Sequence, residues 1–468
     1  MLEPTDNHND DELKELLARF EDMVRKDTFV FFDADDFDIL IEHYFQTQNA
    51  EMLKPAIEGA RVQYPSNPSF RISEAQFLAS QQKLNEALSI LDELETLNPD
   101  DSDLFMTRGY IYSQMGESDK AIENFKQALR VSENKEDVYT SLGSEFINQN
   151  DFENALIYLK KGFELNPENE MIIAEIAICH ELSGKKEEAL EFFTSFTDNH
   201  PFNKWAWFNL GISFSRLSLH EKALDAYDYA ITIDPTFSSA YFNKGNAYAI
   251  LSRFQEAIAV YRETFSYEDP DPSTYYYIGE CYENLEDYSN AISNYNRAVK
   301  LDPNLADAWI SIGIVLEKQN RLTEGIHYVK KALELQPENP DFWYVFAEIQ
   351  EKLGFKEEAL GAYQKVIELN YADYDVWLDY AACLMEAGYL EDALHAMSEG
   401  IKHFPEVADL HYRMSAVLIE CGKRQEAITY LQNALVLDYE KHTELFEYAP
   451  ELKTDRSFLE VKIGRAHV

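Results

Sequence analysis

The chain has 468 residues, of which 46% are hydrophobic and 27% are charged, so it is too apolar for an intrinsically disordered protein. Its 41 lysine and arginine residues are outnumbered by 85 aspartate and glutamate residues, which gives a formal net charge of −44. This excess disfavours direct binding to nucleic acid or to an anionic membrane surface, because both depend on cationic side chains.

Residues 1–33 begin with an acidic segment that lacks the basic start and apolar stretch of a secretory signal. No run of 18 apolar residues occurs in the chain, so we predict no transmembrane helix and expect a cytoplasmic protein. Within residues 10–26, apolar residues recur at the spacing of one helical face: Leu13, Leu16, Leu17, Phe20 and Val24. We predict that residues 1–33 form an N-terminal capping helix for the array that follows.

From residue 34 to residue 441 the sequence repeats every 34 residues. One series of positions carries alanine, with Gly325 at its only gap: Ala87, Ala121, Ala155, Ala189, Ala223, Ala257, Ala291, Ala359, Ala393 and Ala427. Proline keeps the same step at Pro65, Pro99, Pro167, Pro201, Pro235, Pro303, Pro337 and Pro405. A fixed period of this length indicates a stack of supersecondary units, and counting from the prolines gives twelve, from 34–67 to 408–441.

Each 34-residue repeat reads as two helices. In the repeat 238–271, one helical face carries Tyr241, Lys244, Gly245 and Tyr248, and a second face carries Phe254, Ala257, Ile258 and Tyr261. The break between the helices often carries residues that tolerate a left-handed backbone: Gly116, Asn150, Gly184, Gly354, Gly388 and Gly422. Small residues midway along the first helix, such as Gly245, are expected to let the helices approach closely beside the recurring alanines of the second.

These repeats resemble tetratricopeptide repeats. The repeat 204–237 carries almost the whole family pattern, with Trp207, Leu210, Gly211, Phe214, Ala223, Tyr227, Ala230 and Pro235. The resemblance covers residues 34–441 and suggests about twelve tandem repeats of bacterial type. It implies an all-α fold, a right-handed α-solenoid (superhelix) of helix-turn-helix repeats. Residues 442–462 are then expected to form a C-terminal capping segment. Residues 463–468 resemble a translated sequencing adaptor, so we expect a non-native tail and a missing natural C-terminus.

Catalytic motifs are absent from the sequence. No GxGxxG, GxxxxGKS/T or GxSxG pattern occurs, and the His180–Glu181 pair lacks the second histidine of a zinc-binding helix. Cys179, Cys281 and Cys383 are 102 residues apart and occupy one slot of different repeats, where a small buried hydrophobic residue is expected rather than a disulfide or zinc ligand. We therefore expect a protein that is not an enzyme and binds no metal or cofactor.

A second face of each first helix remains after the packed face is assigned. In the resembling family, residues at repeat positions 2, 5, 9 and 12 line a concave groove, and we call these positions the groove stripe. The candidate partner-binding residues on it are Trp205, Phe208, Ile212, Phe242, Asn246, Tyr276, Glu280, Glu283, Glu317, Tyr344, Glu348 and Glu351. Trp205 is the best single candidate, because it adds a tryptophan to the one that the motif already requires. Packing alone is the competing interpretation, since family members commonly carry an aromatic residue at position 5.

The stripe is apolar and aromatic in its first part and aromatic and acidic in its second, which favours an apolar or basic partner segment. One subclass of the family binds C-terminal carboxylates through lysines, and Phe242 and Asp307 replace two of those lysines. We therefore predict a non-enzymatic protein–protein interaction scaffold that binds a peptide or helical segment of a partner in its groove. The alternatives are a regulatory subunit of an enzyme assembly that docks folded partners on other faces, and an enzyme whose catalytic domain followed the present C-terminus.

Overall fold

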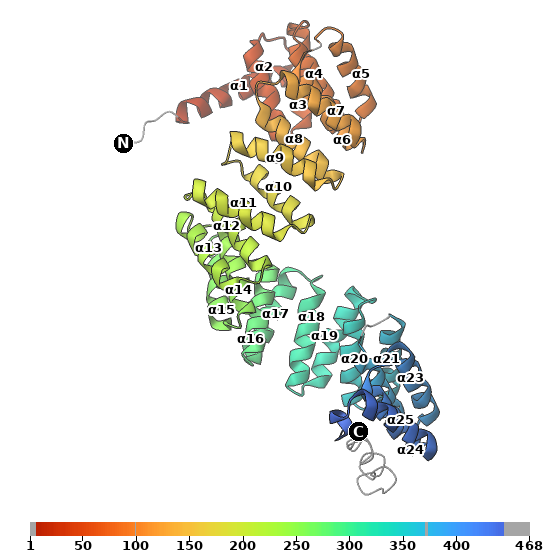
Figure 1. Cartoon of the computed structure of the whole chain (residues 1–468). Helices are drawn as coiled ribbons and strands as arrows, with labels where there is room; N and C mark the ends of the chain where they lie inside the picture. The colour runs from red at the N-terminus through yellow and green to blue at the C-terminus, as the bar shows by residue number, and fades with distance from the viewer. Residues whose placement is uncertain (1–5, 99, 370–372, 444–468) are drawn as a thin grey trace. The chain divides into compact units, whose positions relative to one another are not determined.

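The computed structural model describes residues 6–98, 100–369 and 373–443, with side chains from Glu12 onward. Within these residues it contains 25 α-helices, one short 3₁₀ helix and no strand, which confirms the predicted all-α solenoid (Figure 1). None of the described helices combines the length and apolarity that crossing a membrane requires.

The chain divides into two compact units, Met1–Ile233 and Asp234–Val468. The helices of the N-terminal unit are α1 (Asp6–Lys26), α2 (Ala34–Gln46), α3 (Ala50–Gln63), α4 (Pro68–Ser80), α5 (Leu84–Glu95), α6 (Ser102–Gln114), α7 (Ser118–Val131), α8 (Lys135–Asn148), α9 (Phe152–Leu165), α10 (Glu170–Leu182), α11 (Lys186–Asn199), α12 (Lys204–Arg216) and α13 (His220–Ile233).

The helices of the C-terminal unit are α14 (Ser238–Ile250), α15 (Phe254–Thr264), α16 (Pro272–Asn284), α17 (Tyr288–Leu301), α18 (Ala306–Lys318), α19 (Leu322–Leu335), α20 (Pro340–Lys352), α21 (Lys356–Glu368), α22 (Asp375–Ala387), α23 (Leu390–His403), α24 (Ala408–Glu420) and α25 (Arg424–Leu437), followed by η1 (Glu440–Thr443).

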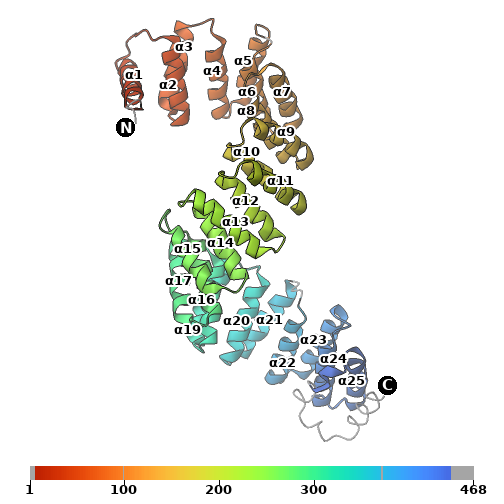
Figure 2. The same cartoon turned by 60° about the vertical axis from the view of Figure 1, so that its left-hand side comes forward.

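The helices from α2 to α25 form consecutive pairs, and the two helices of each pair lie side by side within their unit (Figures 1 and 2). Each even-numbered helix begins at the first residue of a 34-residue repeat or one residue away from it. The proline period in the sequence therefore places the helix starts to within one residue.

The turn inside every pair contains one residue with a positive φ, at repeat position 15. Glycine takes this position five times, at Gly116, Gly184, Gly354, Gly388 and Gly422, with φ between +68° and +85°. The other repeats place Gln48, Gln82, Asn150, Ser218, Ser252, Glu286 and Asn320 there, with φ between +53° and +62°. The left-handed backbone predicted from the glycines and Asn150 is confirmed, and it extends to glutamine, serine and glutamate residues that the sequence does not mark for it.

Glycine at position 8 of the first helix packs against the side chain at position 24 of the second. A Cβ added to Gly279 would lie 2.5 Å from Cε1 of Tyr295, and the same is true of Gly245 with Tyr261. The glycine makes room for an aromatic ring in these repeats. The alanine slot also faces the first helix closely, because a Cβ added to Gly325 would lie 3.1 Å from the carbonyl oxygen of Gly313. The recurring alanines are buried as well, from Ala87 to Ala427.

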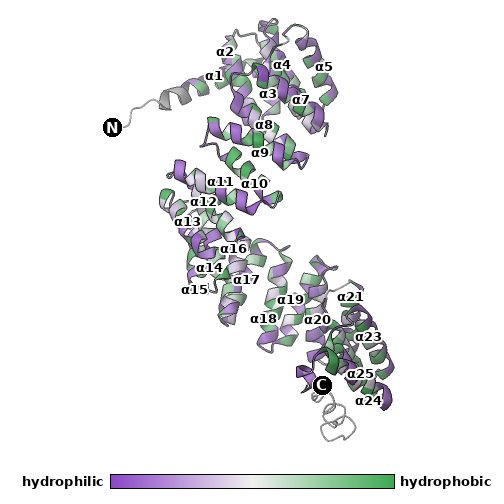
Figure 3. Cartoon of the chain, viewed as in Figure 1, coloured by the Kyte–Doolittle hydropathy of each residue, from purple (hydrophilic) through white to green (hydrophobic). Residues whose placement is uncertain are grey.

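Buried apolar side chains from successive helices form the core of each unit, while most ribbons carry hydrophilic residues on their other side (Figure 3). Cys179, Cys281 and Cys383 are free and buried, as expected for small hydrophobic residues. On α1, Phe20 is fully buried and its ring lies 5.7 Å from that of Phe32 and 6.5 Å from that of Phe37. The N-terminal helix therefore packs on the first helical pair.

A side chain at position 4 of the first helix often hydrogen-bonds to the proline carbonyl six residues earlier. The indole N–H groups of Trp207, Trp309 and Trp343 donate to the carbonyls of Pro201, Pro303 and Pro337 at 2.8–2.9 Å. Tyr241 donates its hydroxyl to Pro235 in the same way, at 3.2 Å. We call this contact the proline clip. It connects the end of one repeat to the start of the next.

Candidate partner-binding surface

Two cavities open between the first helices of consecutive pairs. The hydroxyl cavity, about 640 Å³ in volume, lies in the N-terminal unit between α6 and α8 and reaches the start of α10. The tyrosine cavity, about 580 Å³, lies in the C-terminal unit between α14 and α16 and is lined by Asn246, Tyr261, Tyr277 and Glu280, among others. Groove-stripe positions contribute to both cavities, so in each unit this face is hollowed.

The aromatic residues predicted for the N-terminal unit lie on α12 and are half-buried. Trp205 packs against the core of the unit, and its ring lies edge-on to Phe208 with 6.0 Å between centroids. Phe208 in turn lies 6.1 Å from Tyr227, and Ile212 is half-buried one turn further along. These three residues therefore form a surface that is anchored on one side and exposed on the other.

On α14, Phe242 and Asn246 contact the buried Tyr261 of the same repeat. The Phe242 ring lies 5.7 Å from Tyr261 and 5.6 Å from Tyr277 of the next repeat. The Tyr261 hydroxyl donates to Oδ1 of Asn246 at 2.6 Å. The side-chain oxygen of Asn246 thus accepts the hydrogen bond of a buried tyrosine hydroxyl. The spacing of residues along the sequence does not reveal this contact.

On α16, Tyr276 and Glu280 form a hydrogen-bonded pair. The Tyr276 hydroxyl donates to Oε1 of Glu280 at 2.9 Å. Burial raises the pKa of the Glu280 carboxyl, with smaller contributions from Glu283 and Asp307, while the bond from Tyr276 opposes that increase. Glu280 is therefore a partly desolvated carboxylate that a cationic group of a partner would stabilise.

Glu283 and Glu317 are paired with lysines of the following repeat. Lys318 donates to Oε1 of Glu283 at 2.8 Å, and Lys352 donates to Oε1 of Glu317. Arg216 makes the equivalent contact with Glu181. These contacts connect positions 12 and 13 of neighbouring repeats. The negative charge predicted at Glu283 and Glu317 is consequently neutralised within the chain.

On α20, the three predicted residues have different surroundings. Tyr344 donates its hydroxyl to Asp379, and Glu351 accepts the Tyr363 hydroxyl at 2.7 Å. Glu348 has neither a hydrogen bond nor an ion pair within the described residues. Burial raises the pKa of Glu348, helped by Glu317, Asp379 and Glu351 and opposed by Lys352. Of this group, Glu348 retains the most capacity to bind an external cation.

A common structural role explains several of these polar residues. Tyrosine at position 24 is buried in four repeats, and each hydroxyl needs a hydrogen-bond partner. That partner comes from position 9 or 12 of the same repeat: Ser215 for Tyr227, Asn246 for Tyr261, Glu283 for Tyr295 and Glu351 for Tyr363. Part of the groove stripe therefore stabilises its own repeat.

The hydroxyl cavity contains residues that the sequence reasoning did not select. Its stripe positions include Asp103, Met106, Tyr110 and Thr140. The same positional rule, applied to the repeats 102–135 and 136–169, would have found them. Among the residues with described side chains, no three His, Cys, Asp or Glu residues gather where they could hold a metal ion.

Comparisons with known family models match part of the repeat array. Tetratricopeptide repeat models match residues 102–135, 136–169, 183–236, 226–259 and 272–305. A model of the pre-mRNA-splicing factor Syf1/CRNKL1 C-terminal HAT repeat matches residues 317–432. The Small glutamine-rich tetratricopeptide repeat-containing protein 2 of Mycosarcoma maydis is 31% identical over 85 residues, which are 18% of this chain and 24% of that protein. This chain therefore spans about a quarter of the relative's length.

The solved structures that the chain matches cover different shares of it. The APC/C hetero-tetramer Cut9-Hcn1 has 16% identity and a TM-score of 0.42, and the match covers 82% of this chain and 90% of that one. YrrB, a TPR protein with an unusual peptide-binding site, has 24% identity and a TM-score of 0.34, with coverages of 40% and 96%. MamA has 20% identity and a TM-score of 0.33, with coverages of 34% and 94%.

Proposed function

We propose that this chain, which contains tetratricopeptide repeats, is a non-enzymatic scaffold that holds an extended or helical segment of another protein along its groove stripe. The repeats support a role in protein–protein interaction. Binding along the groove stripe, the groove mode, is supported by the hydroxyl cavity and the tyrosine cavity, because both open on the face formed by the first helices. Concave surfaces of this kind are where ligands bury most of their area.

The proposed partner segment is apolar or basic. We also propose that the interaction takes place in the cytoplasm. Trp205 and Phe208 offer aromatic surface, while Glu280 and Glu348 offer carboxylates whose desolvation a cation would offset. The bacterial type stays a prediction, and the match to a pre-mRNA-splicing repeat model weighs against it.

Photo-crosslinking tests the groove mode. A benzophenone amino acid replaces Phe208 on α12 or, as the control, Tyr229 on α13 of the same repeat, where the side chain is 55% exposed. Crosslinks from position 208 should map to short segments of a partner. Trp205→Ala should lower their yield several-fold and leave position 229 unchanged. Equal crosslinking from both positions would favour folded partners docked on other faces.

Charge can be tested separately on α20. Glu348→Gln removes a carboxylate without breaking a hydrogen bond. It should therefore lower the affinity for a basic partner segment and reduce the salt dependence of that binding. Glu358→Gln, an exposed residue on α21, serves as the matched control. Identical salt slopes for the two variants would remove the acidic part of the stripe from the proposal.

A further inference from the structure

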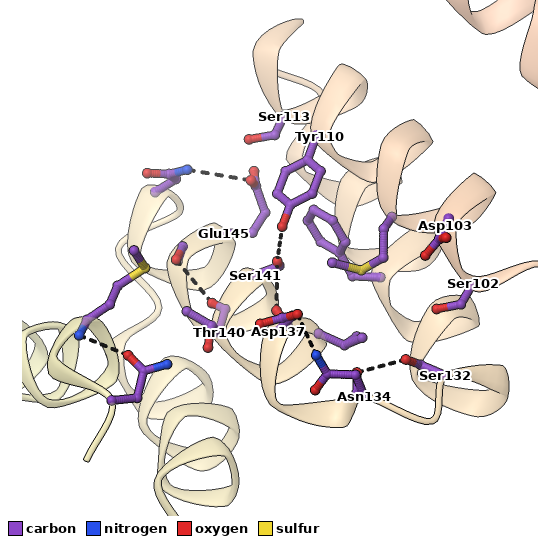
Figure 4. Close-up of a pocket in the computed structure, with 17 residues that line it drawn as sticks. Ser102, Asp103, Tyr110, Ser113, Ser132, Asn134, Asp137, Thr140, Ser141 and Glu145 are labelled. Atoms are coloured by element: carbon purple, nitrogen blue, oxygen red, sulfur yellow. Dashed lines mark hydrogen bonds between the residues drawn. The ribbon is translucent and has the colours of Figure 1, made fainter. Parts of the chain in front are cut away.

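The hydroxyl cavity has walls from two first helices and is separate from every residue predicted for the site. Ser102, Asp103, Tyr110 and Ser113 come from α6, and Asp137 and Glu145 are among those from α8 (Figure 4). At about 640 Å³ it can enclose a long side chain together with its backbone.

Three hydroxyl groups of the cavity, those of Tyr110, Thr140 and Ser141, donate their hydrogens within the chain. Ser141 donates to the carbonyl of Asp137 at 2.9 Å, and Thr140 donates to the carbonyl of Glu136 at 3.0 Å. Since Ser141 has one hydrogen, the 2.7 Å contact with Tyr110 must be donated by the phenol (Figure 4). The oxygen lone pairs of Tyr110 and Thr140 remain available to a donor in the cavity.

A carboxylate stands in the same wall with almost no exposure to water. Glu145 is 3% exposed, and its only hydrogen bond in the described part of the chain is from Asn148 to Oε2, at 3.5 Å. Its second oxygen, Oε1, has no donor there. Oε1 is not one of the fully buried atoms that lack a hydrogen bond, so it reaches the cavity, where a cationic group of a bound ligand could contact it.

The surrounding charges have one sign. Asp103 and Asp137 also line the cavity, whereas the lining contains no lysine or arginine. On the adjacent α10, Glu175 accepts from Ser144, and its other carboxylate oxygen is buried without a hydrogen bond. Burial raises the pKa of Glu175, as expected for a carboxylate without a nearby cation. Met106, Val138 and Phe125 add an apolar wall for an aliphatic stem.

We propose that this cavity binds an arginine side chain of the partner segment, with lysine bound less tightly. The proposal rests on the groove mode described above. Acceptors at Tyr110, Thr140 and Glu145 are distributed around the cavity, and a planar guanidinium has five donors to match them. The methylenes of the stem would lie against Met106 and Val138.

The test uses the full-length chain with ¹³C-methyl-labelled methionine and needs no partner protein. The probe is N-acetyl-arginine methylamide, and its matched control is the citrulline analogue, which has the same shape without the charge. Met106 lines the cavity, and Met106→Leu assigns its signal. We expect saturable shifts with Kd on the order of millimolar, typical of a single side chain, and at least about fivefold weaker binding of citrulline.

Two variants test whether the arginine probe binds in the hydroxyl cavity. Glu145→Gln should weaken arginine binding about fivefold or more, while Glu164→Gln, an exposed change on α9, should leave it unchanged. If Glu145→Gln loses its helical circular dichroism, the exposed Asp103→Asn replaces it, with an expected twofold to threefold loss. The proposal is overturned if Met106 does not shift, if citrulline binds equally well, or if Glu164→Gln has the same effect. Crosslinking at Phe208 could still succeed in that case, so the two proposals fail separately.

Discussion

At the scale of single residues, glycine at position 8 makes room for the side chain at position 24 of the partner helix, which is an aromatic ring in four repeats, Leu159 in one and Val329 in another. Gly279 has no room for a methyl group, because a Cβ would lie 2.5 Å from Cε1 of Tyr295. The ring belongs to a fully buried residue and cannot swing away without disturbing its neighbours. The glycine and the tyrosine of the family pattern therefore form a single packing contact, although they lie in different helices of the repeat.

Gly279→Ala should lower the free energy of unfolding by about 1–3 kcal/mol, the usual cost of overpacking. Gly361→Ala is the control, since nothing lies within 4 Å of its added Cβ and alanine favours a helix by up to about 1 kcal/mol. Urea denaturation of both variants checks the pair. Equal effects would mean that the contact between Gly279 and Tyr295 is not tight.

Tyr295→Phe tests whether the groove carboxylates stabilise the fold. The hydroxyl of Tyr295 is buried and donates to Oε2 of Glu283 at 2.8 Å, a bond to a charged group. Its loss should cost about 1.5–3 kcal/mol of unfolding free energy. Tyr267→Phe, at a tyrosine that is 39% exposed, should change little. An unchanged unfolding free energy for Tyr295→Phe would show that the bond between Tyr295 and Glu283 does not stabilise the repeat.

His180 gives the fold a dependence on pH. It is 2% exposed, and both ring nitrogens are buried without a hydrogen bond among the described residues. Burial lowers its pKa to about 4, helped by Lys160 and Lys185 and opposed by Glu188. The unfolded chain, with a histidine pKa near 6.5, therefore takes up the proton first as the pH falls, and stability is lost between about pH 6.5 and 4.

His180→Phe should remove that loss. The stability of the variant relative to the native chain should rise by up to about 3 kcal/mol between pH 7 and pH 4. Guanidinium denaturation at several pH values measures the difference. A gap that does not change with pH would show that His180 is not the group responsible.

At the scale of the helical pair, the left-handed residue at position 15 ends every first helix. Side chains other than glycine and asparagine are strained there, by roughly 1 kcal/mol or more. Glu286 has φ of +58° and an exposed side chain, so replacing it loses little side-chain packing. Glu286→Gly should stabilise the chain by about 0.5–1 kcal/mol after the entropy of the unfolded glycine is subtracted. Gly354→Ala, at φ of +83°, should do the reverse in the same melting experiment.

At the scale of the whole molecule, the N-terminal unit has a core of its own. The buried clusters between Phe20 and Ala226 draw only on residues of this unit. A fragment of residues 1–233 should therefore fold alone with helical circular dichroism and cooperative unfolding. A fragment ending at residue 218 lacks α13 and leaves the apolar side of α12 uncovered, so it should lose the helicity of α12 as well. Similar melting of both fragments would contradict this.

The sequence predicts the regular features of this chain and misses those that depend on contacts between side chains. A period of 34 residues locates the helix starts, because proline and glycine act through local backbone geometry. From the sequence, the groove stripe is predicted as the face of each first helix that remains after the packed face has been assigned. Asn246 and Glu351 instead accept hydrogen bonds from buried tyrosines, and Glu283 is also neutralised by Lys318. Such pairings cross between helices, so position along the chain does not reveal them.

The proline clip bears on how an array of this kind can change its length over evolutionary time. Its donor and acceptor are six residues apart, as in Trp309 and the carbonyl of Pro303. A tandem duplication of 34 codons copies both halves together wherever its endpoints fall outside that short stretch. The junction with the new repeat would then already contain this hydrogen bond, and no compensating mutation elsewhere in the gene would be needed.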